Sequence, residues 1–281
     1  MSRNSANGTN GEYVLATGTA AAHRLRILNN VYGPGGRRVL IDAGIRRGMR
    51  VADLGCGTGM VTQLLAELVG PEGEVVGVDF SGAQIEKARE LLSREHANVS
   101  FVQASATDTG LARESFDLVY SRFLLIHLTE PDHALREMYD LLKPEGILVC
   151  EDGDLTTAGS EPFSKLHAFS VLFGQLGAVK GVDYTLGRRL FRLVLDANFH
   201  APEITFNQPV IAKGEPKRLL ELSVAEAGPA FVAAGLLTNE ELEQTLNKMH
   251  QAAEDETLLA LLPRMSQVWA RKPGKLLSRA A

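Results

Sequence analysis

The chain has 281 residues, of which 45% are hydrophobic and 22% charged, with a formal net charge of −5 and a pI near 5.8. This length and composition are typical of one large globular α/β domain with insertions. The acidic balance argues against a nucleic-acid partner, because proteins that bind phosphate backbones carry basic surfaces.

The amino-terminal segment is polar. Residues 1–12 lack both the apolar core of a secretory signal and the Arg-rich amphipathic pattern of an import signal, so we expect a disordered tail in a cytoplasmic protein. Residues 13–47 are predicted to form a helical cap, with helices over 19–31 and 36–43 and a break at the sequence GPGG between them. No apolar run reaches the roughly 20 residues that span a bilayer.

The next segment, VADLGCGTGM at residues 51–60, combines a buried strand, an acid and three alternating glycines. Such a turn at the start of a helix lets backbone N–H groups approach a ligand closely. The dinucleotide fingerprint GxGxxG requires a third glycine where Met60 stands. Asp53 at the end of the strand would also repel a pyrophosphate, so these residues favour a ligand that is cationic at this end.

A second acid follows in GEVVGVDFSG, residues 73–82, which is predicted to be a short buried strand ending at Asp79. A carboxylate there can accept hydrogen bonds from both hydroxyls of a ribose. The alternative is that Asp79 caps the following helix, a role for which Ser81 competes. Two acids beside a glycine turn predict S-adenosylmethionine, a nucleoside with a sulfonium and an ammonium but no phosphate.

Strands and helices alternate through the middle of the chain, which predicts a doubly wound, mostly parallel sheet with helices on both faces. Free thiols are expected at Cys56 and Cys150, because strands separated by another strand place them too far apart to bridge and two cysteines make no zinc site. The predicted strands are 50–54, 74–79, 99–103, 116–121 and 146–151, and the predicted helices are 60–69, 82–95 and 131–142.

The alternation of strands and helices changes after residue 155. The domain over 48–281 is predicted to carry two helical lid insertions. The first covers 155–186 and the second 215–262. Between and after them we expect a helix over 187–198 and strands over 203–211 and 264–271.

These segments together resemble the class I S-adenosylmethionine-dependent methyltransferases, in the small-molecule group related to the ubiquinone and menaquinone methyltransferases. The motifs that carry the resemblance are VADLGCGTG, VVGVDFS, VSFVQASATD, SFDLVYSRFLLIHL and LLKPEGILVCED, in that order. The resemblance implies a Rossmann-like sheet of seven strands in the order 3-2-1-4-5-7-6 with the last strand, 264–271, antiparallel.

The resemblance also implies a cofactor site, with S-adenosylhomocysteine as the product. Asp53, Gly55, Cys56, Gly57 and Gly59 would form the methionine end, Asp79 would bind the ribose, and Phe80 would pack on the adenine. Ser105 stands where the family usually has Asp, Ala106 would contact the adenine through its N–H, and Ser121 and Arg122 would contribute backbone contacts. Tyr13 would close over the cofactor, or else pack a loose arm, and Arg24 is a candidate for its carboxylate.

The motifs say less about the methyl acceptor and about the general base that would deprotonate it. Candidate bases are Glu151, Asp152 and Asp154 after the fifth strand and His167 beyond it, with helix caps or solvated loop charges as the alternative for the acids. His127 on an apolar stretch fits a core histidine or a base. Candidate wall residues of the acceptor pocket, which could equally pack the lid on the sheet, are Phe163, Phe169, Phe173 and Tyr184.

The function expected from this pattern is methyl transfer to an O, N or C atom of a small, partly hydrophobic acceptor such as a secondary metabolite or quinone. YSRFLL after the fourth strand lacks the NPPY-type motif of enzymes that methylate planar amino groups. A methyltransferase acting on RNA or a protein side chain, and a non-catalytic binding protein, are the alternatives. No metal site and no nucleic-acid partner are expected, and the oligomeric state is open, with a homodimer as one option.

Overall fold

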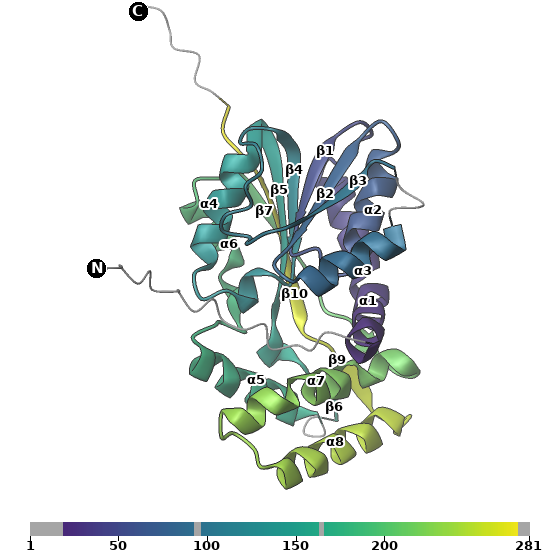
Figure 1. Ribbon diagram of the computed structural model, residues 1–281. Helices are drawn as coiled ribbons and strands as arrows, with labels where there is room; N and C mark the ends of the chain where they lie inside the picture. Colours follow the sequence, from purple (N-terminus) through teal and green to yellow (C-terminus); the bar gives the residue numbers. More distant parts are fainter. Residues whose placement is uncertain (1–18, 93–96, 163–165, 275–281) are drawn as a thin grey trace, which may run out of the picture.

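The computed structural model describes residues 19–92, 97–162 and 166–274, and Figure 1 shows a central sheet, helices on both of its faces and a helical lid at one end. The sheet has the order β3-β2-β1-β4-β5-β10-β7, in which β10 is antiparallel to both neighbours. This confirms the predicted order and the antiparallel last strand. The strands are β1 (Arg50–Leu54), β2 (Glu74–Asp79), β3 (Val99–Gln103), β4 (Phe116–Arg122), β5 (Leu142–Asp154), β7 (His200–Asn207) and β10 (Arg264–Arg271).

Two apolar cores lie on the two faces of the sheet. Helices α1 (Thr19–Ala43) and α2 (Met60–Val69) cover one face, and α4 (Pro131–Leu141) and α6 (Leu190–Asp196) cover the other. Helix α3 (Gly82–Leu92) packs on β3 and β2. Because both faces are covered, strands such as β4 are buried along nearly their whole length and have no polar face.

Helix α1 is continuous, so the predicted break at GPGG is wrong. Pro34 lies inside the helix, where it removes one backbone hydrogen bond. The glycines serve a close approach of the helix to buried polar side chains: a Cβ on Gly36 would lie 2.8 Å from Glu151 Oε1, and one on Gly35 would overlap the Asn207 amide. The tertiary contact therefore overrides the local tendency of these residues to end a helix.

Two glycine-to-alanine substitutions in helices should have opposite effects on stability. We expect Gly36→Ala to lower the free energy of unfolding by about 1–3 kcal/mol, because the new methyl group displaces the buried Glu151 carboxyl. Gly174→Ala in α5 (His167–Lys180) is the control: no atom lies within 4 Å of where its Cβ would lie, so better helix propensity should stabilise the protein by about 0.5–1 kcal/mol. Urea denaturation of the two variants tests the pair, and equal effects would contradict this packing.

Other boundaries shift by a few residues. Strand β5 begins at Leu142 and runs to Asp154, longer at both ends than predicted. The predicted strand over 203–211 divides into β7 and a separate β8 (Val210–Ile211) around Pro209, which has no N–H to donate to a sheet. The predicted helix over 187–198 divides into η3 (Leu186–Arg188) and α6.

The two predicted insertions come together as one lid beyond the sheet (Figure 1). Its helices are α5 (His167–Lys180), η4 (Glu215–Arg218), α7 (Leu219–Ala233) and α8 (Asn239–Glu254), and a capping box at Thr238 starts α8. The sequence did not predict the small sheet β6-β9-β8, in which β9 (Leu259–Leu261) pairs with both β6 (Gly159–Glu161) and β8. These pairings join the first insertion to the second.

Helix α1 connects the sheet to this lid, since it packs on β5 and β10 and also on α7. In the part of the chain that the structure describes, no helix is long and apolar enough to cross a membrane.

Candidate cofactor and acceptor site

A cavity of about 580 Å³ lies between the carboxyl ends of the parallel strands and the lid. Its volume is within the range of small-molecule sites. One part of its wall comes from the turns after β1, β2, β3 and β4, and the other from α1, the 3-10 helix η1 (Leu125–His127), α5 and α7. The predicted cofactor residues in the wall are Asp53, Gly55, Cys56, Gly57, Asp79, Phe80, Ser105, Ala106 and Arg122.

The glycines of the turn after β1 have two different roles: one leaves space for a ligand and another allows close helix packing. Gly57 has φ +54° and no atom within 4 Å of where a Cβ would lie, so it leaves its side of the cavity open. Gly59 has φ +84° and caps α2, but its missing Cβ would lie 2.7 Å from Leu92 Cδ1. Gly59 therefore allows α2 to pack near α3 and is not one of the described residues in the wall.

Asp53 is 2% exposed and accepts a hydrogen bond of 2.6 Å from the hydroxyl of Thr62 on α2. Burial raises its pKa to about 6, against the lowering effects of the Thr62 bond and the Arg122 charge. A buried carboxylate with one hydrogen bond retains acceptor capacity for a cation. This fits the ammonium of a methionine group.

Asp79 is held by the turns on either side. Its carboxylate accepts bonds of 2.9 Å from the backbone N–H groups of Gly57 and Ser81, and burial raises its pKa. Ser81 Oγ accepts from Gln84 N at 3.4 Å, so Ser81 and not Asp79 caps the start of α3. Asp79 is thereby fixed at the cavity edge, where each oxygen has a second lone pair for a ribose hydroxyl.

The adenine end is more open. Phe80 is 65% exposed, which is unusual for a phenyl ring and leaves its face available for a planar base. Ser105 Oγ accepts from Thr107 N at 3.2 Å and lies 2.8 Å from Thr107 Oγ1. The hydroxyl that replaces the usual aspartate is thus already engaged locally, and Ala106 beside it lines the cavity.

Ser121 does not reach the cavity. It is fully buried and its hydroxyl donates to Cys150 Sγ at 3.4 Å. Cys150 and Cys56 are both free and buried, and burial raises the pKa of each thiol. Tyr13, like Phe163, lies outside the described residues.

The predicted bases are not brought to the cavity. Glu151 accepts from Tyr120 Oη and Gln267 Nε2 beneath α1. Asp152 accepts from the Leu125 N–H at 2.8 Å and from the Gly153 N–H, and burial raises its pKa to about 8. His167 starts α5 with Nδ1 near Ser170 Oγ, and none of these three is among the described residues in the cavity wall.

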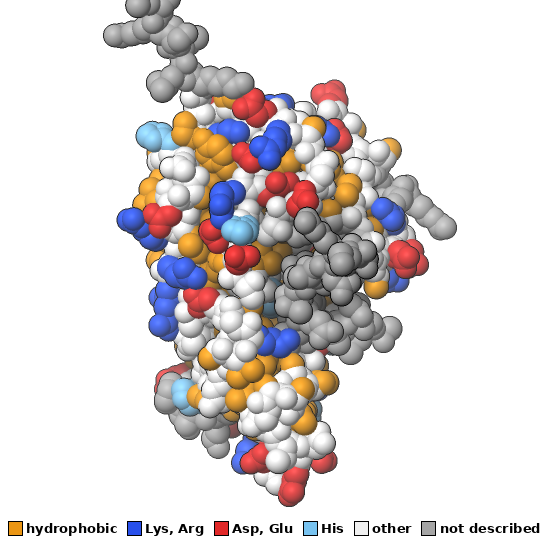
Figure 2. Space-filling view, turned by 60° about the vertical axis from the view of Figure 1, so that its left-hand side comes forward, with side chains coloured by type: hydrophobic (Ala, Val, Ile, Leu, Met, Phe, Trp, Pro, Cys, Tyr) orange, Lys and Arg blue, Asp and Glu red, His pale blue; other side chains and the backbone are white. Residues whose placement is uncertain are grey.

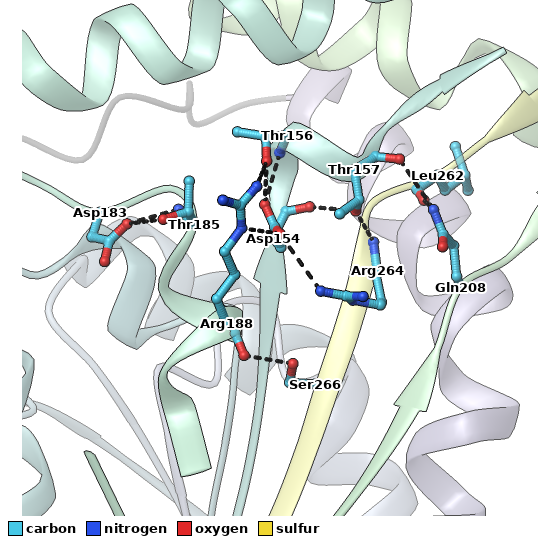
Figure 3. A network of polar contacts seen from close by, with 11 residues as sticks. Asp154, Thr156, Thr157, Asp183, Thr185, Arg188, Gln208, Leu262, Arg264 and Ser266 are labelled. Atoms are coloured by element: carbon cyan, nitrogen blue, oxygen red, sulfur yellow. Dashed lines mark hydrogen bonds and ion pairs between the residues drawn. The ribbon is translucent and has the colours of Figure 1, made fainter. Parts of the chain in front are cut away.

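Asp154 joins the lid to the sheet (Figure 3). It accepts from Arg188 Nε at 2.6 Å and from Thr156, and Arg264 of β10 lies 3.8 Å away. Thr157 accepts from the Arg264 N–H at 2.7 Å. These contacts fix the chain where it leaves β5 for the first insertion, so the acid has a structural position.

Some residues of the acceptor part were predicted only weakly or not at all. His127 lines the cavity, with its ring edge-on to Tyr184 at 5.8 Å, and burial, helped by Arg24, lowers its pKa to about 4. Tyr32 of α1 lines it too and donates to Pro263 O at 2.7 Å. No sequence signal marks Tyr32, because its place depends on how α1 packs; the LLIHL pattern did mark His127.

The lid contributes an apolar wall. Phe169 and Phe173 of α5 line the cavity as predicted, whereas Tyr184 packs behind them, 5.5 Å from the Phe173 ring. Arg24 of α1 lines the cavity but is bound to Glu226 of α7, with an Nε–Oε2 distance of 2.5 Å. Within residues 19–92, 97–162 and 166–274, no cluster of three or more His, Cys, Asp or Glu side chains could hold a metal ion.

Comparisons with known proteins agree with this geometry. Residues 45–184 match the model of a methyltransferase domain family. The chain is 35% identical over 153 residues to a demethylmenaquinone methyltransferase of Staphylococcus aureus, and the match covers 53% of this chain. It spans 62% of the length of that relative.

Solved structures share the fold. A candidate methyltransferase from Bacillus halodurans has a TM-score of 0.60 at 18% identity, with 84% of this chain and 97% of that one covered. A phosphoethanolamine N-methyltransferase from Haemonchus contortus, solved with S-adenosylhomocysteine, has a TM-score of 0.53 at 17% identity, with 90% and 52% covered. The motifs, the sheet order and these matches make the chain similar to the class I S-adenosylmethionine-dependent methyltransferases, a quinone methyltransferase among them.

Proposed function

We propose that this protein transfers a methyl group from S-adenosylmethionine to an O, N or C atom of a small, partly hydrophobic acceptor, such as a secondary metabolite or a quinone-like ring. The observation that carries the proposal is the continuity of one cavity from the glycine turn to the apolar lid. The wall on the lid side includes Leu155, Phe169, Phe173, Leu219 and Leu220.

The cofactor supplies a methyl group activated by its sulfonium, and the chain supplies position and a dry environment. Holding two reactants in line can be equivalent to an effective concentration of about 10⁵ M or more. Asp53 and Asp79 hold the methionine and ribose parts of the donor, and the aromatic and aliphatic lid wall excludes water from the acceptor. Burial lowers the pKa of His127 to about 4, so its imidazole is neutral near pH 7 but a weak proton acceptor, and transfer to an acceptor that needs no strong base is favoured.

The contacts of the short basic runs also favour a small acceptor over RNA. The adjacent arginines of the chain at 37/38, 46/47 and 188/189 could in principle bind phosphates. Four of these six already bind carboxylates: Arg37 with Glu67, Arg38 with Asp42, Arg188 with Asp154 and Arg189 with Asp183. On the face in Figure 2, blue and red side chains alternate without a continuous basic tract. A cytoplasmic location and a homodimer stay predictions from the sequence.

The direct test is methyl transfer from radiolabelled S-adenosylmethionine to phenols, hydroquinones and amines, with total RNA and a protein mixture as further acceptors. Transfer to small aromatic acceptors supports the proposal. Transfer to RNA or protein alone would favour the macromolecular alternative, and binding of S-adenosylhomocysteine without any transfer would favour a binding protein.

A lid substitution then tests which part of the cavity holds the acceptor. Ser223 of α7 lines the cavity, and its hydroxyl donates to Leu219 O within the helix. We expect Ser223→Phe to raise the KM for the acceptor tenfold or more by filling this part, while the Kd of S-adenosylhomocysteine changes less than about twofold. Ser223→Ala, which adds no volume, is the control and should change neither constant appreciably. Equal losses for both ligands would contradict a separate acceptor part.

A further inference from the structure

Arg122 ends β4 beside the glycine turn, because its neighbour Ser121 pairs with Leu54 of β1. The guanidinium lies under α1: its Nη2 donates to Asn29 Oδ1 at 2.9 Å. Its Nη1 is buried and has no hydrogen-bond partner. Arg122 is a residue of the cavity wall, and leaving a buried charged donor unpaired is costly, so a shift of this side chain toward an anionic group bound in the cavity would satisfy the donor.

The neighbourhood of Arg122 is otherwise acidic. Its charge acts to lower the pKa values of Asp53 and Glu151, which burial raises. No ion pair to Arg122 occurs among the residues that the structure describes. The guanidinium is therefore near Asp53, the carboxylate that can pair with an ammonium group, and its Nη1 has no hydrogen-bond partner.

The amino-acid end of S-adenosylmethionine is a zwitterion, with a cation for Asp53 and a carboxylate that needs a cation of its own. The two arginines of the cavity wall are Arg24 and Arg122. Arg24 is occupied by Glu226, and both side chains of that pair are only 6% exposed. Breaking this pair to free Arg24 would strand a buried Glu226.

We propose that the guanidinium of Arg122 binds the methionine carboxylate of the cofactor, and that Asn29 of α1 holds this side chain beside the cavity. This role is a side-chain one and differs from the backbone contact that the motif resemblance implies for Arg122. It goes beyond the proposed acceptor and rests only on the cofactor. The site should consequently prefer ligands that retain the carboxylate.

Calorimetric titration with two probes tests this. S-adenosylhomocysteine carries the ammonium and the carboxylate, whereas its decarboxylated analogue, S-adenosyl-3-thiopropylamine, keeps only the ammonium. For the wild type we expect the first to bind at least about tenfold more tightly, a difference of 1.4 kcal/mol. Arg122→Gln should remove most of this preference by weakening S-adenosylhomocysteine alone.

Two further variants keep the test decisive. Arg122→Lys retains the charge and should retain part of the preference, which also covers the case that Arg122→Gln does not fold. Arg24→Gln tests the other arginine of the wall; because it strands Glu226, only the ratio of the two Kd values is compared, and this ratio should stay unchanged. Arg26→Gln on the exposed face of α1, outside the cavity wall, is the matched control and should change neither Kd appreciably. Loss of the ratio in Arg24→Gln but not in the Arg122 variants, or equal weakening of both probes by Arg122→Gln, would overturn the assignment. Failure of the wild type to bind either probe would instead overturn the cofactor itself.

Discussion

Replacing Asp79 by alanine is expected to weaken binding of S-adenosylhomocysteine by about 100-fold or more. The carboxylate accepts from the N–H groups of Gly57 and Ser81, so its loss releases the glycine turn as well as the proposed ribose contacts. Hydrogen bonds to a charged group contribute about 1.5–3 kcal/mol each, and two at the lower figure correspond to a change of about 150-fold in Kd.

Calorimetric titration of the purified variant measures this effect. Glu86→Ala on the exposed face of α3 removes a carboxylate of similar size nearby and should leave the Kd within about twofold. If Asp79→Ala bound as tightly as the wild type while remaining folded, the ribose assignment would be wrong.

The second large effect concerns Asp53 and pH. An attractive pair of unit charges 4 Å apart is worth about 4 kcal/mol at an effective dielectric near 20, before desolvation is subtracted. If about half of this survives, Asp53→Asn should weaken S-adenosylhomocysteine about 30-fold at pH 7.5. The asparagine retains the shape and one acceptor for the Thr62 hydroxyl, so the loss reports the charge.

The sign of the pH dependence follows from the raised pKa of Asp53, about 6 in the unliganded protein. Below that pH the carboxyl is protonated and must lose its proton before it can pair with an ammonium. Affinity should therefore be full above about pH 7 and fall as the pH drops through 6, by up to tenfold per pH unit from this group.

Burial also raises the pKa of Asp79, so the comparison with Asp53→Asn isolates the contribution of Asp53. The wild type should show the steeper fall, and the two titrations measured between pH 5 and 8 should converge at the acidic end. Parallel curves would show that Asp53 does not carry the charge that the cofactor contacts.

The sequence by itself determined the central architecture and the cofactor end of the site. Alternating buried strands and amphipathic helices require a parallel sheet, and parallel strands bring the residues that follow them to one edge. Asp53, Gly57 and Asp79 could therefore be placed together from local patterns alone. The order of the strands came from the motif resemblance, and the structure agrees with it.

Only the tertiary structure decided the rest, because it depends on which side chains distant segments bring face to face. Helix α1 continues through Gly36 because it packs closely against Glu151 there. This packing buries the carboxyl group that the sequence suggested as a candidate base. Asp152 likewise accepts a hydrogen bond from the backbone of η1, a contact between residues too far apart in the sequence to be predicted. Arg24 and Arg122 look equivalent in the sequence, but Glu226, which is 202 residues from Arg24, occupies one and leaves the other with an unpaired donor.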